Sequence, residues 1–232
     1  MNFLSALSKG IVQPIVQPIV RAGKLFVLSA LLVSSHSFAA LPAGSVVAEL
    51  SSLLGLNHTF SAYFEQSVYN HRGRGIQESH GRIWVERPGR FRWQATEPFP
   101  QTVVSNGDKL WFYDPDLEQV TIRKFDNQLA ATPGLLLSGE VEQLDQSFVV
   151  INGAVMPQIK GVKRYILTPR NADSLFAELE LVFKERQLVA MQIRDGLGQL
   201  TEFRFSDVTV NQPIDSAQFQ FVVPEGVDVI QQ

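Results

Sequence analysis

Short runs of alternating apolar and polar side chains recur along most of this chain, and no other feature constrains its fold as strongly. Between residues 81 and 86, Gly81, Ile83 and Val85 alternate with polar or amphipathic neighbours. Similar runs occupy residues 60–65, 90–93, 175–183 and 202–205, with turn signals such as Pro-Gly, Asn-Gly and Asp-Gly between runs. Because successive side chains of a strand point to opposite faces of a sheet, this spacing predicts roughly eleven short strands. Such a meander indicates a mainly β fold with one large antiparallel sheet, curled or closed around its apolar face.

Two segments depart from this pattern and predict short helices. Residues 45–54 carry apolar side chains at helical spacing, with Ser45 suited to cap the helix and Gly55 to stop it. Residues 132–139 begin with Thr-Pro, continue into three consecutive leucines and end at glycine. The leucines spread apolar surface around much of this second helix, so it must be covered. We expect it to cap the concave face of the sheet.

The N-terminal region predicts export. The only charged residues before position 40 are the basic Lys9, Arg21 and Lys24. An apolar run at 25–33 and the sequence Ser-Phe-Ala at 37–39 follow, which together are typical of a secretory signal peptide cleaved between Ala39 and Ala40. The run is about half the ~20 residues of a membrane span, so a non-cleaved anchor is the less favoured alternative. We therefore expect a signal peptide at 1–39 and one domain at 40–232, located in the periplasm.

Charge and cysteine content narrow the class of protein. Removing residues 1–39 leaves 17 Lys and Arg against 23 Asp and Glu, which is a net charge of −6. This balance argues against generic nucleic-acid binding. The chain has no cysteine, so it offers no acceptor for an N-terminal lipid anchor, and a domain of this size can bury a core without disulfides. We expect the mature protein to be free in the periplasm.

Catalytic and metal-binding patterns are absent from the sequence. It has no thiol nucleophile, no HExxH helix, no Gly-x-Ser-x-Gly elbow and no glycine-rich phosphate loop. His71 and His80 could approach each other across a hairpin, although exposed loop histidines are far commoner than such a metal site. We expect a binding protein with no cofactor and no metal rather than an enzyme. A hydrolase built on paired carboxylates is a weaker alternative.

Aromatic residues concentrate on neighbouring predicted strands. Six of them fall within about thirty residues: Trp84, Phe91, Trp93, Trp111, Phe112 and Tyr113. They fit either an ordinary sheet core or the lining of a hollow apolar cavity, since barrels of comparable size often hold apolar ligands. Composition alone does not choose between the two interpretations.

The segment Gly-Arg-Ile-Trp-Val-Glu-Arg-Pro-Gly-Arg-Phe-Arg-Trp at 81–93 resembles the LolA family of periplasmic outer-membrane lipoprotein carriers. The family pattern is Arg-Pro-x-x-Phe-x-Trp after a Gly-x-apolar-x-Val strand. Further segments similar to the family follow in order at 64–66, 110–120, 132–137, 165–169 and 219–227. The resemblance covers roughly residues 57–228. It implies an unclosed antiparallel β-barrel of roughly eleven strands, with a helical lid over a hydrophobic cavity.

The resemblance also implies a function and partners. Such a carrier is a monomeric chaperone that accepts acylated lipoproteins from an ATP-driven release complex in the inner membrane. It then hands them to an outer-membrane lipoprotein receptor. The main alternative is a periplasmic lipid- or peptide-sensing module with the same half-barrel. The receptor shares this fold but is lipid-anchored, which the missing cysteine excludes.

Individual residues take expected roles from the same resemblance. Arg87 occupies the position of the arginine that bonds the lid backbone and holds the empty carrier closed. Phe91 matches an aromatic residue near the cavity mouth that takes part in transfer. The candidates for lining the cavity or for transfer are Phe64, Trp84, Phe91, Trp93, Trp111, Leu135, Leu136 and Leu137. We expect Arg82, Arg90 and Arg92 to form a basic patch that meets an acidic partner, with a solvated strand face as the alternative.

Overall fold

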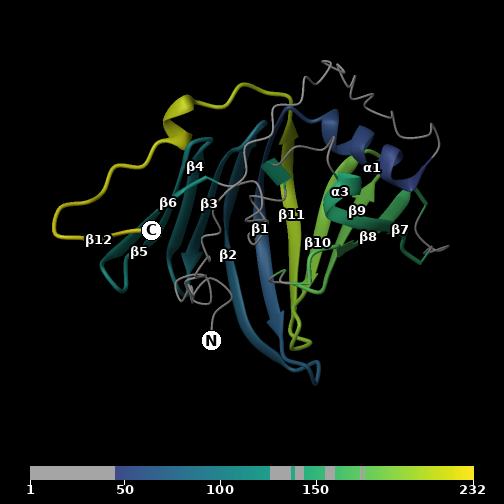
Figure 1. Ribbon diagram of the computed structural model, residues 1–232, viewed down its shortest axis with the longest axis horizontal. Helices are drawn as coiled ribbons and strands as arrows, with labels where there is room; N and C mark the ends of the chain where they lie inside the picture. The colour runs from purple at the N-terminus through teal and green to yellow at the C-terminus, as the bar shows by residue number, and fades with distance from the viewer. Residues whose placement is uncertain (1–44, 126–136, 139–143, 155–159, 173, 175) are drawn as a thin grey trace, which may run out of the picture. The chain divides into compact units, whose positions relative to one another are not determined.

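Twelve strands form a single sheet in the computed structural model, which describes residues 45–125, 137–138, 144–154, 160–172, 174 and 176–232 (Figure 1). All of these lie within the compact unit Pro42–Gln232. The strands are β1 Thr59–Tyr69, β2 Gly75–Glu86, β3 Arg90–Glu97, β4 Gln101–Asn106, β5 Lys109–Asp114, β6 Gln119–Lys124, β7 Phe148–Asn152, β8 Val162–Pro169, β9 Glu178–Lys184, β10 Gln187–Arg194, β11 Leu200–Val210 and β12 Asp228–Gln231. The predicted cleavage site at Ala39 and Ala40 and the candidates Leu135 and Leu136 lie outside the described residues.

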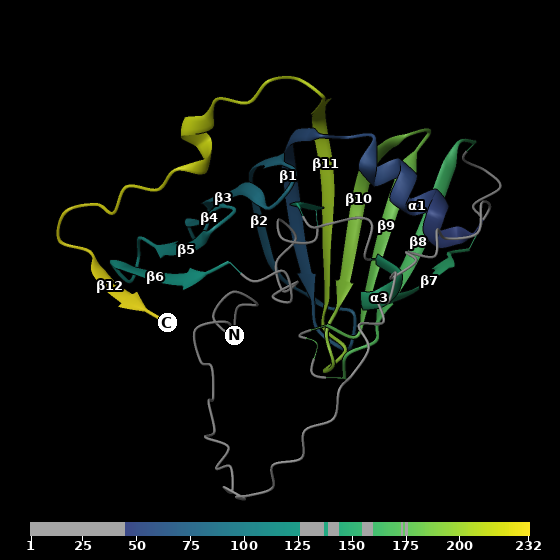
Figure 2. The same cartoon turned by 45° about the horizontal axis from the view of Figure 1, so that its top comes forward.

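The sheet is open and almost entirely antiparallel. Its order is β12-β6-β5-β4-β3-β2-β1-β11-β10-β9-β8-β7, so β12 and β7 are its edges. The predicted meander is confirmed by β1 to β11, each of which pairs antiparallel with its neighbours among them. The sequence does not predict the twelfth strand. It pairs parallel with β6, because the chain runs from β11 in the middle of the sheet to the edge at β6 before it re-enters the sheet (Figure 2).

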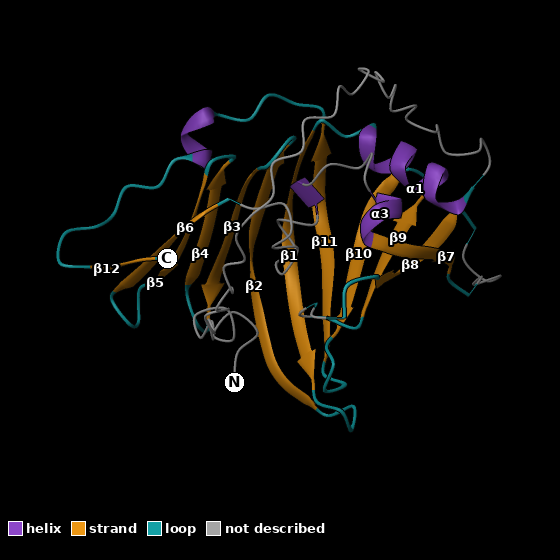
Figure 3. Ribbon diagram, in the orientation of Figure 1, coloured by secondary structure: helices purple, strands orange, loops and turns teal. Residues whose placement is uncertain are grey.

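Helix α1, Val46–Gly55, confirms the first predicted helix. The Ser45 side chain accepts a hydrogen bond from the Ala48 backbone N–H at 3.1 Å, which satisfies one of the free donors of the first turn. The helix buries Leu50, Leu53 and Leu54, and it lies over the β7–β9 end of the sheet together with the short α3, Leu144–Ser147 (Figure 3). Of the second predicted helix only residues 137–138 are described, and both are helical.

Strand pairing sorts the side chains onto two faces of the sheet. On one face, Phe64 pairs with Gly81 and Ile83 pairs with Trp93 across β1, β2 and β3. We name this the inner face, because it is the face that α1 covers. Lys163, on the same face of β8, forms an ion pair with Glu49 of α1. The other, outer face carries Arg82, Trp84, Arg90 and Arg92 of β2 and β3.

The C-terminal segment covers part of the outer face. After β11 it forms the 3₁₀ helix η3, Ser216–Phe219, which packs against β3 and β4. Phe221, Val223 and Val227 then pack on a cluster of Val104, Trp111 and Val120 from β4, β5 and β6. The outer face of β4–β6 is therefore part of the hydrophobic core.

Candidate functional site

Aromatic side chains from three strands meet on the inner face. The rings of Phe64 in β1 and Trp93 in β3 stack with their centroids 3.8 Å apart, at an interplanar angle of 22°. Phe203 of β11 meets the Trp93 ring edge-on at 5.1 Å. Beside them, Phe60 and Phe205 form another edge-on pair at 5.6 Å. Each such pair contributes about 0.5–1.5 kcal/mol beyond the burial of its area. We call these five residues the inner aromatic cluster.

Gly81 makes the stack between Phe64 and Trp93 possible. A Cβ atom at Gly81 would lie 2.0 Å from the carbonyl oxygen of Gln94 and 2.7 Å from Cζ of Phe64. Both separations are far below van der Waals contact. The glycine therefore lets the Phe64 ring cross β2 and reach Trp93 on the strand beyond it.

The apolar inner face continues beyond the aromatic cluster. On one side it includes Ile83, Val85 and Phe91, and on the other Leu181 and Met191. All five side chains are at most 2% exposed. The candidates Phe64, Phe91 and Trp93 thus share one continuous apolar face of the sheet. Phe91 is fully buried in this structure, so it is not at an exposed mouth.

The turn between β2 and β3 contacts the end of the predicted lid helix. The backbone N–H of Gly89 donates to the carbonyl oxygen of Ser138 at 2.9 Å, and the Gly89 carbonyl accepts from the Ser105 hydroxyl at 2.7 Å. Leu137 and Ser138 are both buried. Arg87 lies in this turn, is half-buried, and donates its backbone N–H to the carbonyl oxygen of His58 at 2.9 Å. The candidate arginine therefore lies two residues from a backbone contact with the lid helix.

Two of the three tryptophans do not join this surface. Trp84 pairs with Ser61 and Arg92, and Trp111 pairs with Val104 and Ile122, so both lie on the outer face. Trp111 packs under the C-terminal segment. The expectation that these tryptophans line the same hollow as Trp93 does not fit this register, because neighbouring residues of one strand alternate between faces.

The three candidate arginines of the basic patch share the outer face, but their surroundings differ. Arg90 forms an ion pair with Glu86 and lies over the Phe219 ring at 5.5 Å. Arg92 is half-buried, and this burial lowers the pKa of its guanidinium. Arg82 contacts two aromatic rings, with Cζ 4.9 Å from the centroids of both Tyr63 and Trp84. They do not form a uniform solvent-facing patch.

Sequence reasoning did not select Phe60, Phe203 and Phe205 as site residues. The alternation of Phe203 and Phe205 with charged neighbours predicted a buried face for β11. It did not show that β11 pairs with β1, more than a hundred residues earlier, which is what brings these rings to Phe60 and Phe64. The phenylalanines at alternating positions of β1 and β11, all on the buried face of their strands, are the signal that could have indicated them.

The described part of the chain contains neither a metal cluster nor a membrane-spanning helix. Within it, no three or more His, Cys, Asp or Glu side chains are arranged to hold a metal ion. No helix in the same ranges is both long and apolar enough to cross a membrane.

Comparison with known proteins identifies the family. A model described as outer membrane lipoprotein carrier protein LolA matches residues 57–222. The outer-membrane lipoprotein carrier protein of Azotobacter vinelandii is 42% identical over 205 residues, covering 87% of this chain and 97% of the relative. The carrier protein of Hahella chejuensis is 43% identical over 203 residues, covering 84% and 96%. A solved structure of an uncharacterized conserved protein from Thermus thermophilus has a TM-score of 0.52 at 12% identity, covering 81% of this chain and 100% of that one, which is a likeness of fold alone. The inner-face geometry and these matches agree, and the chain belongs to the LolA family of outer-membrane lipoprotein carrier proteins.

Proposed function

We propose that this chain is a periplasmic chaperone that binds the acyl chains of lipoproteins released from the inner membrane and delivers them to an outer-membrane receptor. Membership of a carrier family makes it a lipoprotein carrier and a binding protein rather than an enzyme. The observation that supports acyl binding is the continuous apolar inner face of an open sheet, with the inner aromatic cluster at its centre.

The energetics of an acyl chain explain why a carrier needs such a surface. Burying one CH₂ group is worth about 0.8 kcal/mol, so a chain of about fourteen methylenes is worth ~11 kcal/mol. A lipoprotein with several such chains cannot cross water at a useful rate alone. An apolar surface of β1, β3 and β11 can replace the membrane for those chains during transit.

An empty carrier must also cover that surface, because a large exposed apolar patch causes association. The leucine helix at 132–139 is the element proposed to do so. The hydrogen bond from Gly89 to Ser138 supports this, since it joins the helix end to the β2–β3 turn. We assign to Arg87 the role of bonding the helix backbone at 135–138. Hydrogen bonds with one charged partner contribute about 1–3 kcal/mol each, enough to favour closure and still let cargo displace the helix.

The two transfer partners are proposed from the carrier role. Cargo would come from an ATP-driven release complex of the inner membrane and leave to a lipid-anchored receptor of the outer membrane. The protein would act as a monomer, without a cofactor.

Location in the periplasm is proposed from the N-terminal segment. The small-x-small site at 37–39 should be cleaved, so the mature protein should begin at Ala40 and fractionate with periplasmic contents. Intact-mass analysis of protein from fractionated cells checks this. A chain that retains Met1, or one found in the membrane fraction, would contradict it.

One binding experiment tests acyl recognition. Purified mature protein, with a hydrophobic dye bound, is titrated with a triacylated lipoprotein and with the same lipoprotein lacking acyl chains. Only the acylated form should displace the dye. Equal displacement by both forms would show that the protein part of the cargo is recognised. Displacement by free fatty acid but not by lipoprotein would favour a lipid sensor.

A further inference from the structure

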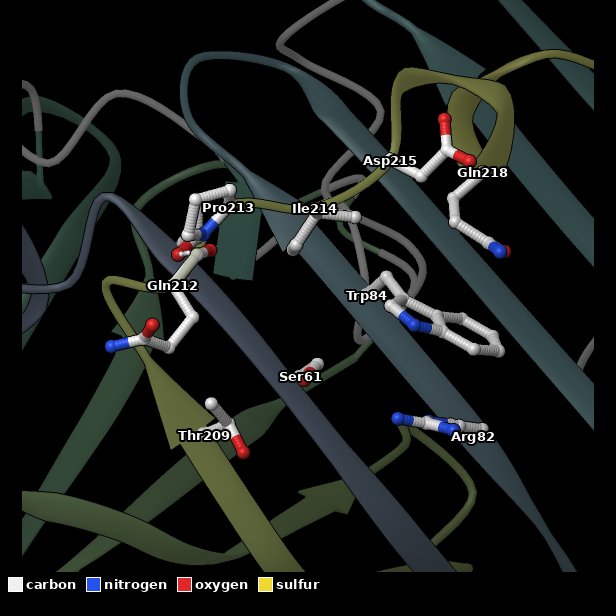
Figure 4. A pocket seen from close by; sticks show the side chains of 10 residues that line it. Ser61, Arg82, Trp84, Thr209, Gln212, Pro213, Ile214, Asp215 and Gln218 are labelled. Carbon is white, nitrogen blue, oxygen red and sulfur yellow. Dashed lines mark hydrogen bonds between the residues drawn. The ribbon is translucent and has the colours of Figure 1, made fainter.

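A pocket on the outer face is separate from the apolar inner surface. It has a volume of about 270 Å³ and lies between β1, β2, β11 and the segment that leaves β11. Figure 4 shows Arg82 and Trp84 side by side along one wall, Ser61 and Thr209 nearer the floor, and the segment 212–215 opposite. None of the residues that line it belongs to the inner aromatic cluster.

Arg82 differs from four other outer-face arginines, each of which has a polar side-chain partner. Arg90 pairs with Glu86, Arg164 with Glu180 and Arg204 with Glu202, the last at 3.8 Å. Arg92 donates to the side-chain oxygen of Gln94 at 3.4 Å. Within the described ranges, Arg82 forms no ion pair, and its Nε atom is buried without a hydrogen-bond acceptor. Leaving a buried charged donor without an acceptor is unfavourable, so an acceptor placed beside this guanidinium would be stabilising.

The guanidinium of Arg82 is held in place by aromatic rings rather than by a carboxylate. Tyr63 and Trp84 each lie 4.9 Å from its Cζ atom. Cation–π contacts of this kind use no N–H group of the guanidinium, so its N–H groups can still donate to an anion. A planar fork fixed in this way suits two parallel hydrogen bonds to one carboxylate.

The opposite wall of the pocket is also fixed. The Thr59 hydroxyl donates to the Gln212 carbonyl oxygen at 2.7 Å, and the Asp215 side chain accepts from the Ala217 backbone N–H at 2.9 Å. Asp215 adds a negative charge to the pocket lining. One arginine facing a carboxylate is a poor site for a doubly charged phosphate, whereas a singly charged carboxylate requires less positive charge.

We propose that this pocket binds the carboxylate of an acidic side chain in an extended segment of a partner protein. The carboxylate pairs with the Arg82 guanidinium, and an apolar neighbour in the segment packs on the Trp84 indole. Arg82, rather than Arg90 or Arg92, is then the specific residue of the predicted basic patch. The site lies on the other face of the sheet from the inner aromatic cluster, so it is accessible whether or not acyl chains are bound. This inference keeps the expectation of an acidic partner but does not depend on acyl binding.

Nuclear magnetic resonance on the intact mature protein tests the proposal. The probes are a blocked Glu-Leu dipeptide, its Gln-Leu analogue and inorganic phosphate, each titrated to millimolar concentration. The readouts are the Nε–H signal of Arg82 and the indole N–H signal of Trp84. The Glu peptide should shift both signals saturably, and the Gln peptide should bind at least about tenfold more weakly, since it forms no charge-assisted pair. Phosphate should not saturate either signal.

Matched variants locate the binding. Arg82→Gln should reduce affinity for the Glu peptide at least about tenfold. Arg204→Gln, the same charge change on β11 and outside the pocket lining, should not. If Arg82→Gln fails to fold, Thr209→Glu tests the same pocket. This variant places a carboxylate in the pocket and should abolish binding of the Glu peptide.

The proposal is overturned if the Glu peptide does not bind or binds no better than the Gln peptide. Phosphate binding as strongly as the Glu peptide, or unchanged binding by the folded pocket variants, also overturns it. Loss of acyl binding in the dye assay leaves this result unaffected, so the two proposals fail separately.

Discussion

Gly81 is the residue on which the inner aromatic cluster depends most directly. Its missing side chain leaves the space that the Phe64 ring fills on its way to Trp93, and the Gln94 backbone closes the same space from β3. The alternation of β2 places Gly81 on the buried face. Glycine there weakens a strand in isolation, so its presence indicates a close approach by neighbouring atoms.

Gly81→Ala should therefore destabilise the protein. The new Cβ would lie 2.0 Å from a backbone oxygen that cannot move without disturbing the β2–β3 pairing, so we expect a loss of about 1–3 kcal/mol in the free energy of unfolding. Urea unfolding followed by circular dichroism measures it. The control is Gly196→Ala, where no atom lies within 4 Å of the new Cβ, and which should change stability by about 0.5 kcal/mol or less. Equal midpoints for the two variants would show that the backbone yields without cost.

The three tryptophans should report differently on cargo. Trp93 is in the inner aromatic cluster, whereas Trp84 and Trp111 are on the outer face. In variants that keep one tryptophan and replace the others with phenylalanine, acylated lipoprotein should change the fluorescence of the Trp93 form. The forms that keep Trp84 or Trp111 should change little. A large fluorescence change confined to the Trp84 or Trp111 form would show that the acyl chains bind the outer face and would contradict this prediction.

The sequence predicts the face of the sheet on which some of the tryptophans lie, but not the face of all three. Alternation in β2 already put Trp84 with Arg82 and Glu86 and opposite to Ile83, so grouping it with Trp93 followed aromatic character rather than periodicity. In β5 the run Leu-Trp-Phe-Tyr at 110–113 has no alternation, because both faces are covered there. The face of Trp111 depends on the register with β4 and on the C-terminal segment, which are long-range contacts.

At the scale of elements, α1 was predicted by local signals that the structure confirms. Ser45 caps it, and the apolar positions Leu50, Leu53 and Leu54 point into the core. What local signals could not predict is its attachment to β8, more than a hundred residues away. There the Lys163 ammonium pairs with the Glu49 carboxylate.

That attachment should make the stability of α1 depend on pH. The hydrogen bond from Lys163 lowers the pKa of Glu49 below its ordinary value of 4.5. The unfolded chain then binds this proton more readily than the folded one, so the stabilisation is present above pH 4.5 and is lost as the pH falls through the lowered pKa. Both side chains are substantially exposed, so the contribution is small, about 0.5 kcal/mol or less.

The measurement is the unfolding midpoint Tm between neutral pH and about pH 3, where carboxylates become protonated. Glu49→Gln should have a slightly lower Tm than the unmodified protein at neutral pH, and the difference should vanish at the acid end. A Glu65→Gln variant, which removes a carboxylate from an exposed position of β1, is the control. A difference that persists or grows in acid would show that this ion pair does not hold α1.

At the scale of the whole sheet, two faces are available for two tasks. The inner face is apolar across most strands, and Ser138 of the predicted lid helix accepts a hydrogen bond from the β2–β3 turn. The outer face carries the pocket at Arg82 and the packed C-terminal segment. A carrier that engages partners on one face while holding acyl chains on the other can be recognised without exposing its cargo.

The lid equilibrium is the property of the whole molecule that Arg87 should control, and Arg87→Leu tests it. The variant should fold, since the Gly89–Ser138 hydrogen bond and the β2–β3 pairing involve only backbone atoms. Without the charge-assisted bonds proposed for Arg87, the open state gains about 1–3 kcal/mol. In this variant the discharge of cargo no longer re-forms those bonds. The variant should therefore accept lipoprotein from inner membranes and fail to deliver it.

Arg87→Lys separates the charge of Arg87 from its planar shape. Its loss of delivery should be smaller than that of Arg87→Leu if charge suffices, and nearly as large if the planar guanidinium is needed. A two-step transfer assay with purified components, scored separately for loading and delivery, measures both. If Arg87→Leu loads and delivers like the unmodified protein, Arg87 does not hold this lid closed.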